Sequence, residues 1–127
     1  MRALLFGLTL VMIGGTNAVA HHSTAMFDMS KTVTVQGTID AFEWTNPHSW
    51  IWLNVPNASG GVDRYGIEGM SPNYLSRVGW SRKALKPGDK VSIDINPLRD
   101  GRKGGFCVAV TLADGQTTLR SRPAPAR

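Results

Sequence analysis

The fold of this chain follows from residues 32–44, which read TVTVQGTIDAFEW. Apolar and polar side chains alternate strictly over most of this stretch, which is the pattern of a strand with one buried face. The apolar phase slips by one position at residues 41–42 and then continues to Trp44, and such a slip indicates a bulge or a bend. Gly37 is a second point at which the strand can coil. The stretch therefore predicts one long, curved first strand.

Four further strands and one short helix are expected along the chain. Alternating apolar patterns predict strands at residues 49–55, 62–68, 91–96 and 106–112, separated by turns rich in Gly, Pro, Asn and Asp. Between the third and fourth strands, Ser71 reads as a helix N-cap followed by Pro72, and Gly79 ends the helix. The side chains expected to fill the interior are Ile39, Ile51, Leu53, Ile67, Val91, Ile93, Val108 and Val110.

This order of elements is typical of an OB-type five-stranded Greek-key barrel, in which a helix lies between the third and fourth strands. One-sided alternation in each strand fits a closed barrel that buries its interior. The sequence therefore predicts an all-β (mainly β) fold, a small OB-like barrel over residues 32–114 with one short helix. Another small β-sandwich or barrel is the alternative.

The two ends of the chain differ from the barrel. Residues 1–20 combine Arg2, a short apolar run and Ala18-Val19-Ala20, which is the pattern of a cleaved secretory signal peptide. The apolar run is too short to span a membrane stably, so we expect a periplasmic or secreted protein without a membrane span after cleavage. Residues 21–31 show no period and are expected to be irregular, and residues 115–127, rich in Arg and Pro, are expected to be disordered.

Charge and cysteine content exclude some classes of protein. The formal net charge is +5, but residues 21–119 carry 10 Lys and Arg against 9 Asp and Glu, so the basic excess lies at the ends of the chain. A nearly neutral body predicts no nucleic-acid partner. The single cysteine, Cys107, excludes an intramolecular disulfide, and its apolar surroundings favour a buried, inert thiol over a reactive one.

Residues 43–52, EWTNPHSWIW, hold three of the four tryptophans. On an OB-like barrel they form the loop between strands one and two, where such folds bind ligands by stacking. Residues 68–73 precede the helix, whose N-terminus can hold an anion. The predicted ligand-binding residues are Glu43, Trp44, Asn46, His48, Trp50, Glu68, Ser71 and Asn73. The alternative interpretation is structural, with Trp44, Trp50 and Trp52 covering one end of the barrel and Ser71 serving as an ordinary cap.

The same segments resemble a known family. The resemblance rests on HHS and MFD within residues 21–28, FEWTNPHSW at 42–50, IEGMSPN at 67–73, GWS at 79–81, LKPGD at 85–89 and VTLADG at 110–115. These motifs are similar to those of a family of small exported bacterial proteins, a domain of unknown function (numbered 6152). The resemblance covers essentially the whole mature domain and implies export and a single small domain. It implies no activity and no catalytic residue.

The expected mature N-terminus raises a second hypothesis, metal binding. After cleavage, His21 carries a free α-amine beside its imidazole, with His22 next to it, and these groups lose their protons near neutral pH. Such nitrogens bind copper or zinc, and the thioethers of Met26 and Met29 favour Cu(I). His48 completes a copper site if the terminus folds back over the loop between strands one and two. The alternative is a flexible terminus that holds no metal.

Catalytic motifs are scarce. Glu43 and Glu68 are the only glutamates and can pair as a general acid and base, although an ion pair or cap contact to Arg64 or Arg77 is the favoured interpretation. No Ser-His-Asp order, glycine-rich phosphate loop or CxxC pattern is present. We therefore expect a non-enzymatic binding or accessory module for an unknown small molecule or exported protein. A copper-binding protein and a structural partner of an exported complex are the alternatives.

Overall fold

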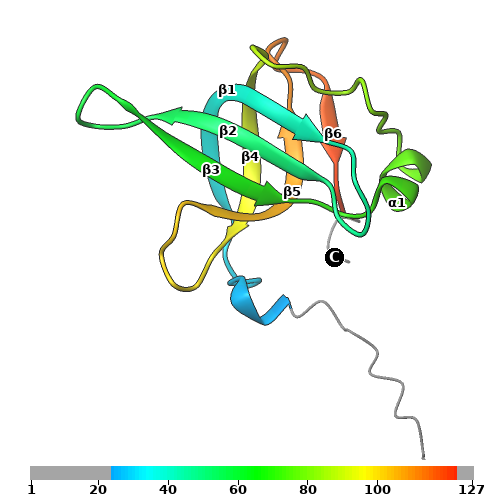
Figure 1. Ribbon diagram of the computed structural model, residues 1–127, viewed down its shortest axis with the longest axis horizontal. Helices are drawn as coiled ribbons and strands as arrows, with labels where there is room; N and C mark the ends of the chain where they lie inside the picture. Colours follow the sequence, from blue (N-terminus) through cyan, green and yellow to red (C-terminus); the bar gives the residue numbers. More distant parts are fainter. Residues whose placement is uncertain (1–23, 123–127) are drawn as a thin grey trace, which may run out of the picture.

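The first strand, β1 (Val33–Glu43), pairs with two different neighbours along its length. The computed structural model describes residues 24–122 of the chain (Figure 1). The first half of β1 pairs antiparallel with β4 (Lys90–Pro97), and its second half pairs antiparallel with β2 (Trp50–Pro56). The β1–β2 register shifts between Ile39 and Ala41, which confirms the predicted bulge.

Gly37 lies just before the point at which β1 changes partner. It is opposite Val91 of β4, and a Cβ atom at this position would collide with the backbone carbonyl oxygen of Asn54 on β2. The missing side chain therefore lets β2 and β4 approach the same segment of β1 from two sides. This close approach explains why a glycine is needed where the strand coils.

The sheet closes into a barrel through β3 and β5. Strand β2 pairs antiparallel with β3 (Val62–Glu68), and β4 pairs antiparallel with β5 (Gly104–Thr111). A parallel pairing between β3 and β5 completes the circle β1–β2–β3–β5–β4 (Figure 1). This is the arrangement of an OB-type barrel, so the predicted fold class is confirmed.

One short helix, α1 (Pro72–Arg77), lies between β3 and β4 as predicted. The hydroxyl of Ser71 accepts a hydrogen bond from the backbone N–H of Tyr74, which caps the first turn. Gly79 follows the helix with φ +98°, a conformation common at helix C-termini. Among the described residues, no helix has the length and apolar character needed to cross a membrane.

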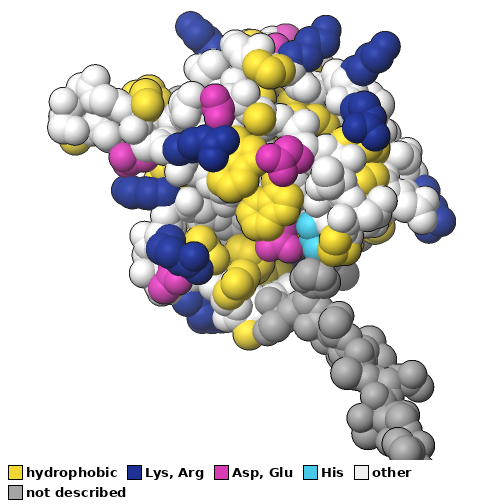
Figure 2. Space-filling view, viewed as in Figure 1, with side chains coloured by type: hydrophobic (Ala, Val, Ile, Leu, Met, Phe, Trp, Pro, Cys, Tyr) yellow, Lys and Arg dark blue, Asp and Glu magenta, His cyan; other side chains and the backbone are white. Residues whose placement is uncertain are grey.

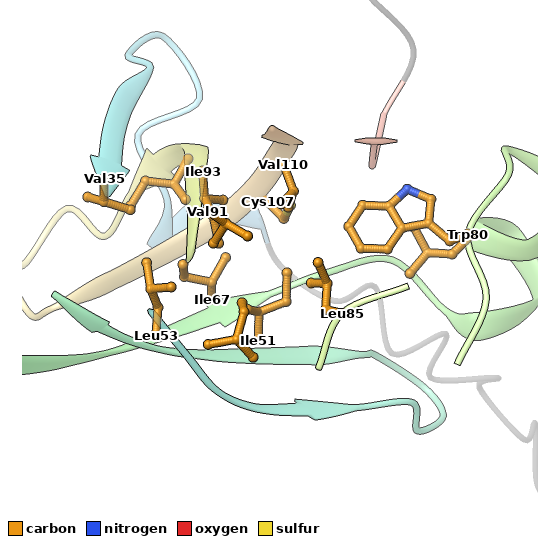
Figure 3. Packing of buried hydrophobic residues seen from close by; sticks show 13 residues of the cluster. Val35, Ile51, Leu53, Ile67, Trp80, Leu85, Val91, Ile93, Cys107 and Val110 are labelled. Atoms are coloured by element: carbon orange, nitrogen blue, oxygen red, sulfur yellow. The ribbon is translucent and has the colours of Figure 1, made fainter. Parts of the chain in front are cut away.

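The barrel interior is filled by apolar side chains from all five barrel strands (Figure 3). Trp80 and Leu85, from the segment between α1 and β4, join this cluster. The predicted interior residues that are buried are Ile39, Ile51, Leu53, Ile67, Val91, Ile93 and Val110. The predicted alternation therefore identifies the buried face of β1, β2, β3 and β4.

The prediction for Val108 is wrong. The β4–β5 register shifts between Asp94, which pairs with Ala109, and Ile95, which pairs with Cys107, so Val108 lies in a bulge. Val108 is only half-buried, whereas Cys107 is 1% exposed within the core. Burial raises the pKa of the Cys107 thiol to about 12, in agreement with the predicted inert cysteine.

The prediction of disorder over residues 115–127 is wrong for the described part of this tail. Strand β6 (Thr118–Arg120) pairs antiparallel with β5. The backbone carbonyl of Arg120 accepts a hydrogen bond from Nε1 of Trp80 at 2.9 Å, and Ser121 is 1% exposed. Arg122 donates from Nη2 to Oδ1 of Asn96 at 2.6 Å. Backbone pairing and single side-chain contacts hold this segment, and neither produces an apolar period in the sequence.

Residues 24–31 lie against the barrel as an irregular segment, as predicted for residues 21–31. Thr24–Met26 is a single 3-10 turn (η1), and Phe27 forms one isolated bridge to Leu98. The ring of Phe27 is 4% exposed and packs on Phe106, with 5.4 Å between the ring centroids. His21, His22 and the predicted signal peptide of residues 1–20 lie outside the described residues.

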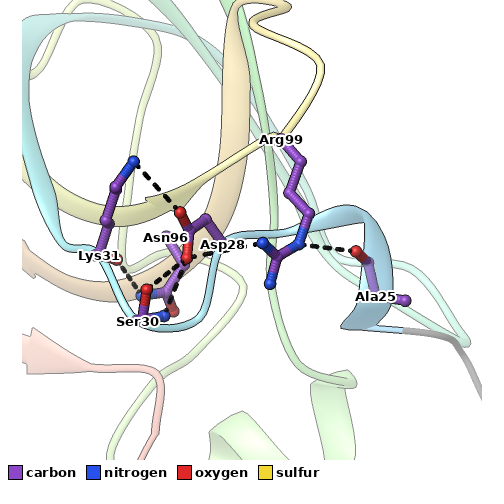
Figure 4. A network of polar contacts seen from close by, with 6 residues as sticks. All are labelled: Ala25, Asp28, Ser30, Lys31, Asn96 and Arg99. Atoms are coloured by element: carbon purple, nitrogen blue, oxygen red, sulfur yellow. Dashed lines mark hydrogen bonds and ion pairs between the residues drawn. The ribbon is translucent and has the colours of Figure 1, made fainter.

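Polar contacts fasten this segment to β4 and the loop after it (Figure 4). The Asp28 carboxylate accepts a hydrogen bond from the Ser30 hydroxyl at 2.6 Å and lies 3.4 Å from Nζ of Lys31, and these contacts lower the pKa of Asp28. Asn96 donates from Nδ2 to the Lys31 carbonyl at 2.6 Å. Arg99 donates from Nε to a backbone carbonyl of η1 at 3.1 Å. The N-terminal segment is thus fixed beside the β4–β5 loop.

Candidate functional site

The loop between β1 and β2 is fastened to the segment between β3 and α1. The backbone N–H of Ser49 donates to the carbonyl of Met70 at 3.2 Å, and the N–H of Gly69 donates to the carbonyl of Ser49 at 2.8 Å. The Ser49 hydroxyl also donates to the Met70 carbonyl at 2.9 Å, and Ser49 is buried. The two predicted site segments, residues 43–50 and 68–73, therefore lie side by side.

His48 and Glu68 meet at this junction. Nδ1 of His48 lies 2.8 Å from the backbone carbonyl oxygen of Gly69 and 3.2 Å from Oε1 of Glu68. Because a carbonyl oxygen only accepts hydrogen bonds, Nδ1 carries a hydrogen atom, and the neutral ring has its lone pair on Nε2. The side chains of His48 and Glu68 are 17% and 11% exposed.

Outward-pointing side chains of β1, β2 and β3 form rows across the barrel surface. Trp50 on β2 is opposite Glu43 on β1 and opposite Glu68 on β3. Trp52 points to the same side of β2, because alternate residues of a strand share a face, and it is opposite Gly66 on β3. We call the surface formed by Glu43, Trp50, Trp52, Arg64, Gly66 and Glu68 the tryptophan face.

Trp52 is held in place by four contacts. Its Nε1 donates to Oε1 of Glu43 at 2.8 Å, and the Arg64 guanidinium lies 4.2 Å from its ring centroid, a cation–π distance. The ring lies against Gly66, where an added Cβ would come within 2.8 Å of Cζ3 of Trp52. Trp50 stacks beside it, with 5.8 Å between centroids and an interplanar angle of 15°. The glycine therefore makes room for the aromatic pair.

A hollow of about 340 Å³ adjoins the tryptophan face. The β4–β5 loop and the N-terminal segment form its other walls. These two segments contribute Met26, Phe27, Leu98, Arg102 and Lys103, and β5 contributes Gly105. Figure 2 shows hydrophobic side chains in the middle of the surface formed by β2 and β3, with Lys and Arg side chains around them.

The cations around the tryptophan face are paired with carboxylates. The pairs are Arg64–Asp40 at 2.9 Å, Arg102–Asp100 at 2.7 Å and Lys103–Asp63 at 3.3 Å. Hydrogen bonds from Arg102 lower the pKa of Asp100, and hydrogen bonds from Asn57 and Lys103 lower the pKa of Asp63. Both carboxyls are therefore ionised near neutral pH, and the surface carries compensated charge.

Other predicted site residues lie apart from this face. Trp44 packs edge-on against Phe42, with 5.7 Å between centroids, and is partly buried against the core. Asn46 and Asn73 are exposed, and the hydroxyl of Ser71 caps α1. Trp44 and Ser71 thus have the contacts that the structural interpretation expects.

The sequence prediction included Glu43, Trp50 and Glu68 but missed Trp52 and Arg64 as site residues. The signal was present in the strand pattern, because Trp50 and Trp52 alternate with buried apolar residues and therefore point outward together. The sequence could not show the register that places a glycine beneath Trp52. It also could not show that the β4–β5 loop returns to this surface.

The two glutamates have separate partners. Glu43 accepts from the indole of Trp52, and Glu68 faces His48, on opposite sides of Trp50 in the strand register. The favoured interpretation of an ion pair from a glutamate to Arg64 is wrong, because Arg64 pairs with Asp40. An acid–base role for the two glutamates gains no support from these contacts.

The metal hypothesis stays a prediction. Within residues 24–122, no three His, Cys, Asp or Glu side chains lie close enough together to hold a metal ion. Of the predicted ligands, His48 is described, and His21 and His22 lie outside the described residues. Met26 lines the hollow beside Trp50, and its side chain is exposed.

A second hollow, of about 490 Å³, lies where β1, β4 and the end of β5 meet. Its wall holds one charged residue, Lys90, and no aromatic ring; the other residues are Gln36, Gly37, Thr38, Pro56, Val91, Ser92, Leu112 and Ala113. Ligand sites usually combine apolar or aromatic walls with a few directed polar groups. The smaller hollow beside the tryptophan face fits that description better.

Comparison with known proteins places the chain in a family without assigning an activity. No curated protein and no solved structure matches the chain. The family that matches is described as a Family of unknown function (DUF6152), and the match covers residues 9–108, which include β1 to β4 and the first half of β5. The match spans most of the sequence and includes both predicted site segments, residues 43–50 and 68–73. The chain therefore belongs to the Family of unknown function (DUF6152).

Proposed function

We propose that this domain is a non-enzymatic ligand-binding module, exported by the predicted signal peptide, whose ligand lies on the tryptophan face. The observation that carries the proposal is the pair of stacked indole rings, Trp50 and Trp52, on the outside of the barrel beside a hollow. Large aromatic side chains dominate the energetics of cores and interfaces because of their area. An aromatic pair that lies at the surface and is held by specific contacts supports a role in binding a ligand.

The position of this pair on the fold supports the same conclusion. OB-type barrels bind their ligands on the face of strands two and three, between the loops that follow the first and fourth strands. Here β2 and β3 carry the tryptophan face, and the β4–β5 loop contributes Arg102 and Lys103 to the hollow. The β1–β2 loop carries His48, whose Nδ1 lies 3.2 Å from Oε1 of Glu68 on the tryptophan face. The proposal thus keeps part of the predicted site and moves its centre onto the strands.

A fragment screen observed by NMR tests this proposal without knowledge of the ligand. The four indole N–H groups, of Trp44, Trp50, Trp52 and Trp80, give separate reporters in one ¹⁵N spectrum. We expect fragments that bind to shift the signals of Trp50 and Trp52 and to leave that of Trp80 unchanged. Fragments that gather at the second hollow, or a library that leaves both surface indoles unshifted, would contradict the proposal.

Copper binding is a second candidate function, favoured by the geometry of His48. Its Nδ1–H donates to the Gly69 carbonyl and faces Glu68, and these contacts fix the orientation and the tautomer of the ring. Metal-bound histidines commonly have the other ring nitrogen held by a carboxylate or a backbone carbonyl in this way. The predicted terminal ligands His21 and His22 would complete the site.

A Cu(II) titration of protein that begins at His21 tests this candidate. We expect uptake of about one equivalent, and weaker binding below about pH 6, where protons compete for imidazole and amine. One extra residue before His21 displaces the amine from its chelate and should weaken binding strongly. His48→Ala should weaken binding only if the terminus and the β1–β2 loop share the metal. Equal affinity with and without the extra residue would rule out the terminal site.

A further inference from the structure

The charges around the tryptophan face limit the ligand that it can recognise. Proteins that bind single-stranded nucleic acid combine stacking aromatics with a groove of uncompensated positive charge. Here Arg64, Arg102 and Lys103 each have a carboxylate partner. The stacking surface is present, and the excess of positive charge that a polyanion requires is not found among the described residues at this surface.

A cationic ligand fits equally poorly. Glu43 and Glu68 flank Trp50, which by itself resembles a site for an ammonium group. However, Glu43 accepts a hydrogen bond from Trp52, and Glu68 faces His48. Among the described residues that line the adjoining hollow, Glu68 is the only carboxylate, and Asp100 and Asp63 are already paired with Arg102 and Lys103, so the hollow offers a cation no further partner. The balance of charge therefore favours a neutral ligand.

The arrangement around Trp50 suits a ring with one apolar face and a polar rim. In the strand register the indole lies between a carboxylate on β1 and a carboxylate on β3, Glu43 and Glu68. Residues directly opposite in neighbouring strands have Cβ atoms about 4.5–5.5 Å apart, so both carboxylates are within reach of a ring that lies on Trp50. A carboxylate has about four acceptor positions, and each glutamate can therefore accept hydroxyl groups besides its present partner.

We propose that the ligand of the tryptophan face is a neutral oligosaccharide, with one sugar ring stacked on Trp50 and its hydroxyls bound by Glu43 and Glu68. This inference rests on the proposed binding function and adds the ligand class. A pyranose with equatorial hydroxyls presents flat C–H faces and hydroxyl groups around its edge, which matches an aromatic ring between two acceptors. The hollow of about 340 Å³ extends the site beyond Trp50, and it is near the lower end of the usual range for ligand sites, about 300–1,000 Å³. The site therefore holds a short segment of the oligosaccharide.

Isothermal titration with four defined probes tests the inference. The probes are cellopentaose and chitopentaose as neutral saccharides, decathymidylate as a polyanion and spermidine as a cation. We expect at least one saccharide to bind, and Trp50→Ala to weaken it by about tenfold or more, the order of one aromatic contact. Trp50→Phe, which keeps a ring, should restore part of the affinity. Glu43→Gln and Glu68→Gln should each weaken binding several-fold, since an amide offers fewer acceptor positions.

Val78→Ala is the matched control, because Val78 is an exposed apolar residue at the end of α1, away from the tryptophan face. It should leave saccharide affinity unchanged, and a far-UV circular dichroism spectrum should show each variant to be folded.

If decathymidylate or spermidine binds in a Trp50-dependent way and neither saccharide binds, the saccharide inference is wrong and the binding function stands. If no fragment or probe perturbs the Trp50 indole, both are wrong. Saccharide binding that is unchanged in Trp50→Ala also overturns the inference.

Discussion

Trp80 and Trp52 both donate their indole N–H groups, but they use their rings in opposite ways. Trp80 is 4% exposed, packs in the core and donates to the backbone carbonyl of Arg120. Trp52 lies on the outer face of β2, donates to the carboxylate of Glu43 and stacks with Trp50. A satisfied indole N–H therefore does not separate a structural tryptophan from a binding one. The two kinds of tryptophan differ instead in how far the ring is buried. Substitutions in the core around Trp80 and on the tryptophan face should therefore have different effects.

The largest effect on stability is expected for Trp80→Ala. Removal of a buried tryptophan ring leaves a cavity and should lower the free energy of unfolding by about 3–5 kcal/mol. Urea denaturation of the purified domain measures this change. Trp80→Phe should cost less, because a ring still contacts Phe42, which lies 6.0 Å from Trp80 between centroids. A loss no larger than that of Trp50→Ala would remove the contrast between the two regions.

Truncation after Gly115 tests the same region from the other side. It removes β6 and the Arg120 carbonyl that accepts from Trp80, and a buried donor without a partner costs about 1–3 kcal/mol. We expect a lower melting temperature and a red shift of tryptophan fluorescence as water reaches Trp80. An unchanged melting temperature would show that residues 116–127 add nothing, as the sequence alone suggested.

The barrel strands could be predicted from the sequence because their apolar alternation reports one buried face. The alternation fails at β5, where Phe106, Cys107, Ala109 and Val110 are all buried, so both phases are apolar and the pattern does not locate the bulge at Val108. Strand β6 could not be seen, because three residues form too short a period and the strand is held mainly by backbone pairing to β5.

The candidate site was predictable to the extent that it depends on single strands. The segment around Trp50 and the segment after Glu68 were placed together because the order of elements brings both loops to one end of the barrel. The tryptophan face depends on cross-strand register, which pairs Trp52 with Gly66. Register follows from bulges and turn lengths that the apolar pattern locates only approximately.

Gly66→Ala tests the packing of the Trp52 ring on the tryptophan face. The new Cβ would lie 2.8 Å from Cζ3 of Trp52, so the ring must move, and overpacking of this kind costs about 1–3 kcal/mol. Near-UV circular dichroism should report the altered Trp50–Trp52 stacking. Gly61→Ala, in the same hairpin, is the control, because its Cβ would meet Asn57 only at 3.6 Å or more. Equal spectra for the two variants would show that the ring does not depend on Gly66.

Trp50→Ala should have a smaller effect on stability than any of these changes. Its half-buried ring lies outside the core, and the expected loss is about 1 kcal/mol, near the centre of the range for point mutations. Thermal unfolding monitored by circular dichroism measures it. The combination of a small loss of stability and a large loss of saccharide affinity would separate Trp50 from Trp80. A loss of stability as large as that of Trp80→Ala would mean that Trp50 is mainly structural.

The smallest effect is expected for alkylation of Cys107, because its buried thiol should hardly react in the folded protein. Burial raises its thiol pKa to about 12 from an ordinary value near 8.5, so the folded state disfavours the thiolate. The stability linked to this thiol is complete below the unfolded pKa and declines as the pH rises toward 12. Iodoacetamide at pH 8 should therefore leave the folded protein unmodified for hours and react quickly in urea, as intact mass shows. Truncation after Gly115 removes the buried Ser121, whose backbone N–H donates to the carbonyl of Val108 beside Cys107, so the truncated protein should react faster than the full chain. Equal protection in both proteins would mean that the barrel alone shields Cys107, and would confine the role of β6 to Trp80.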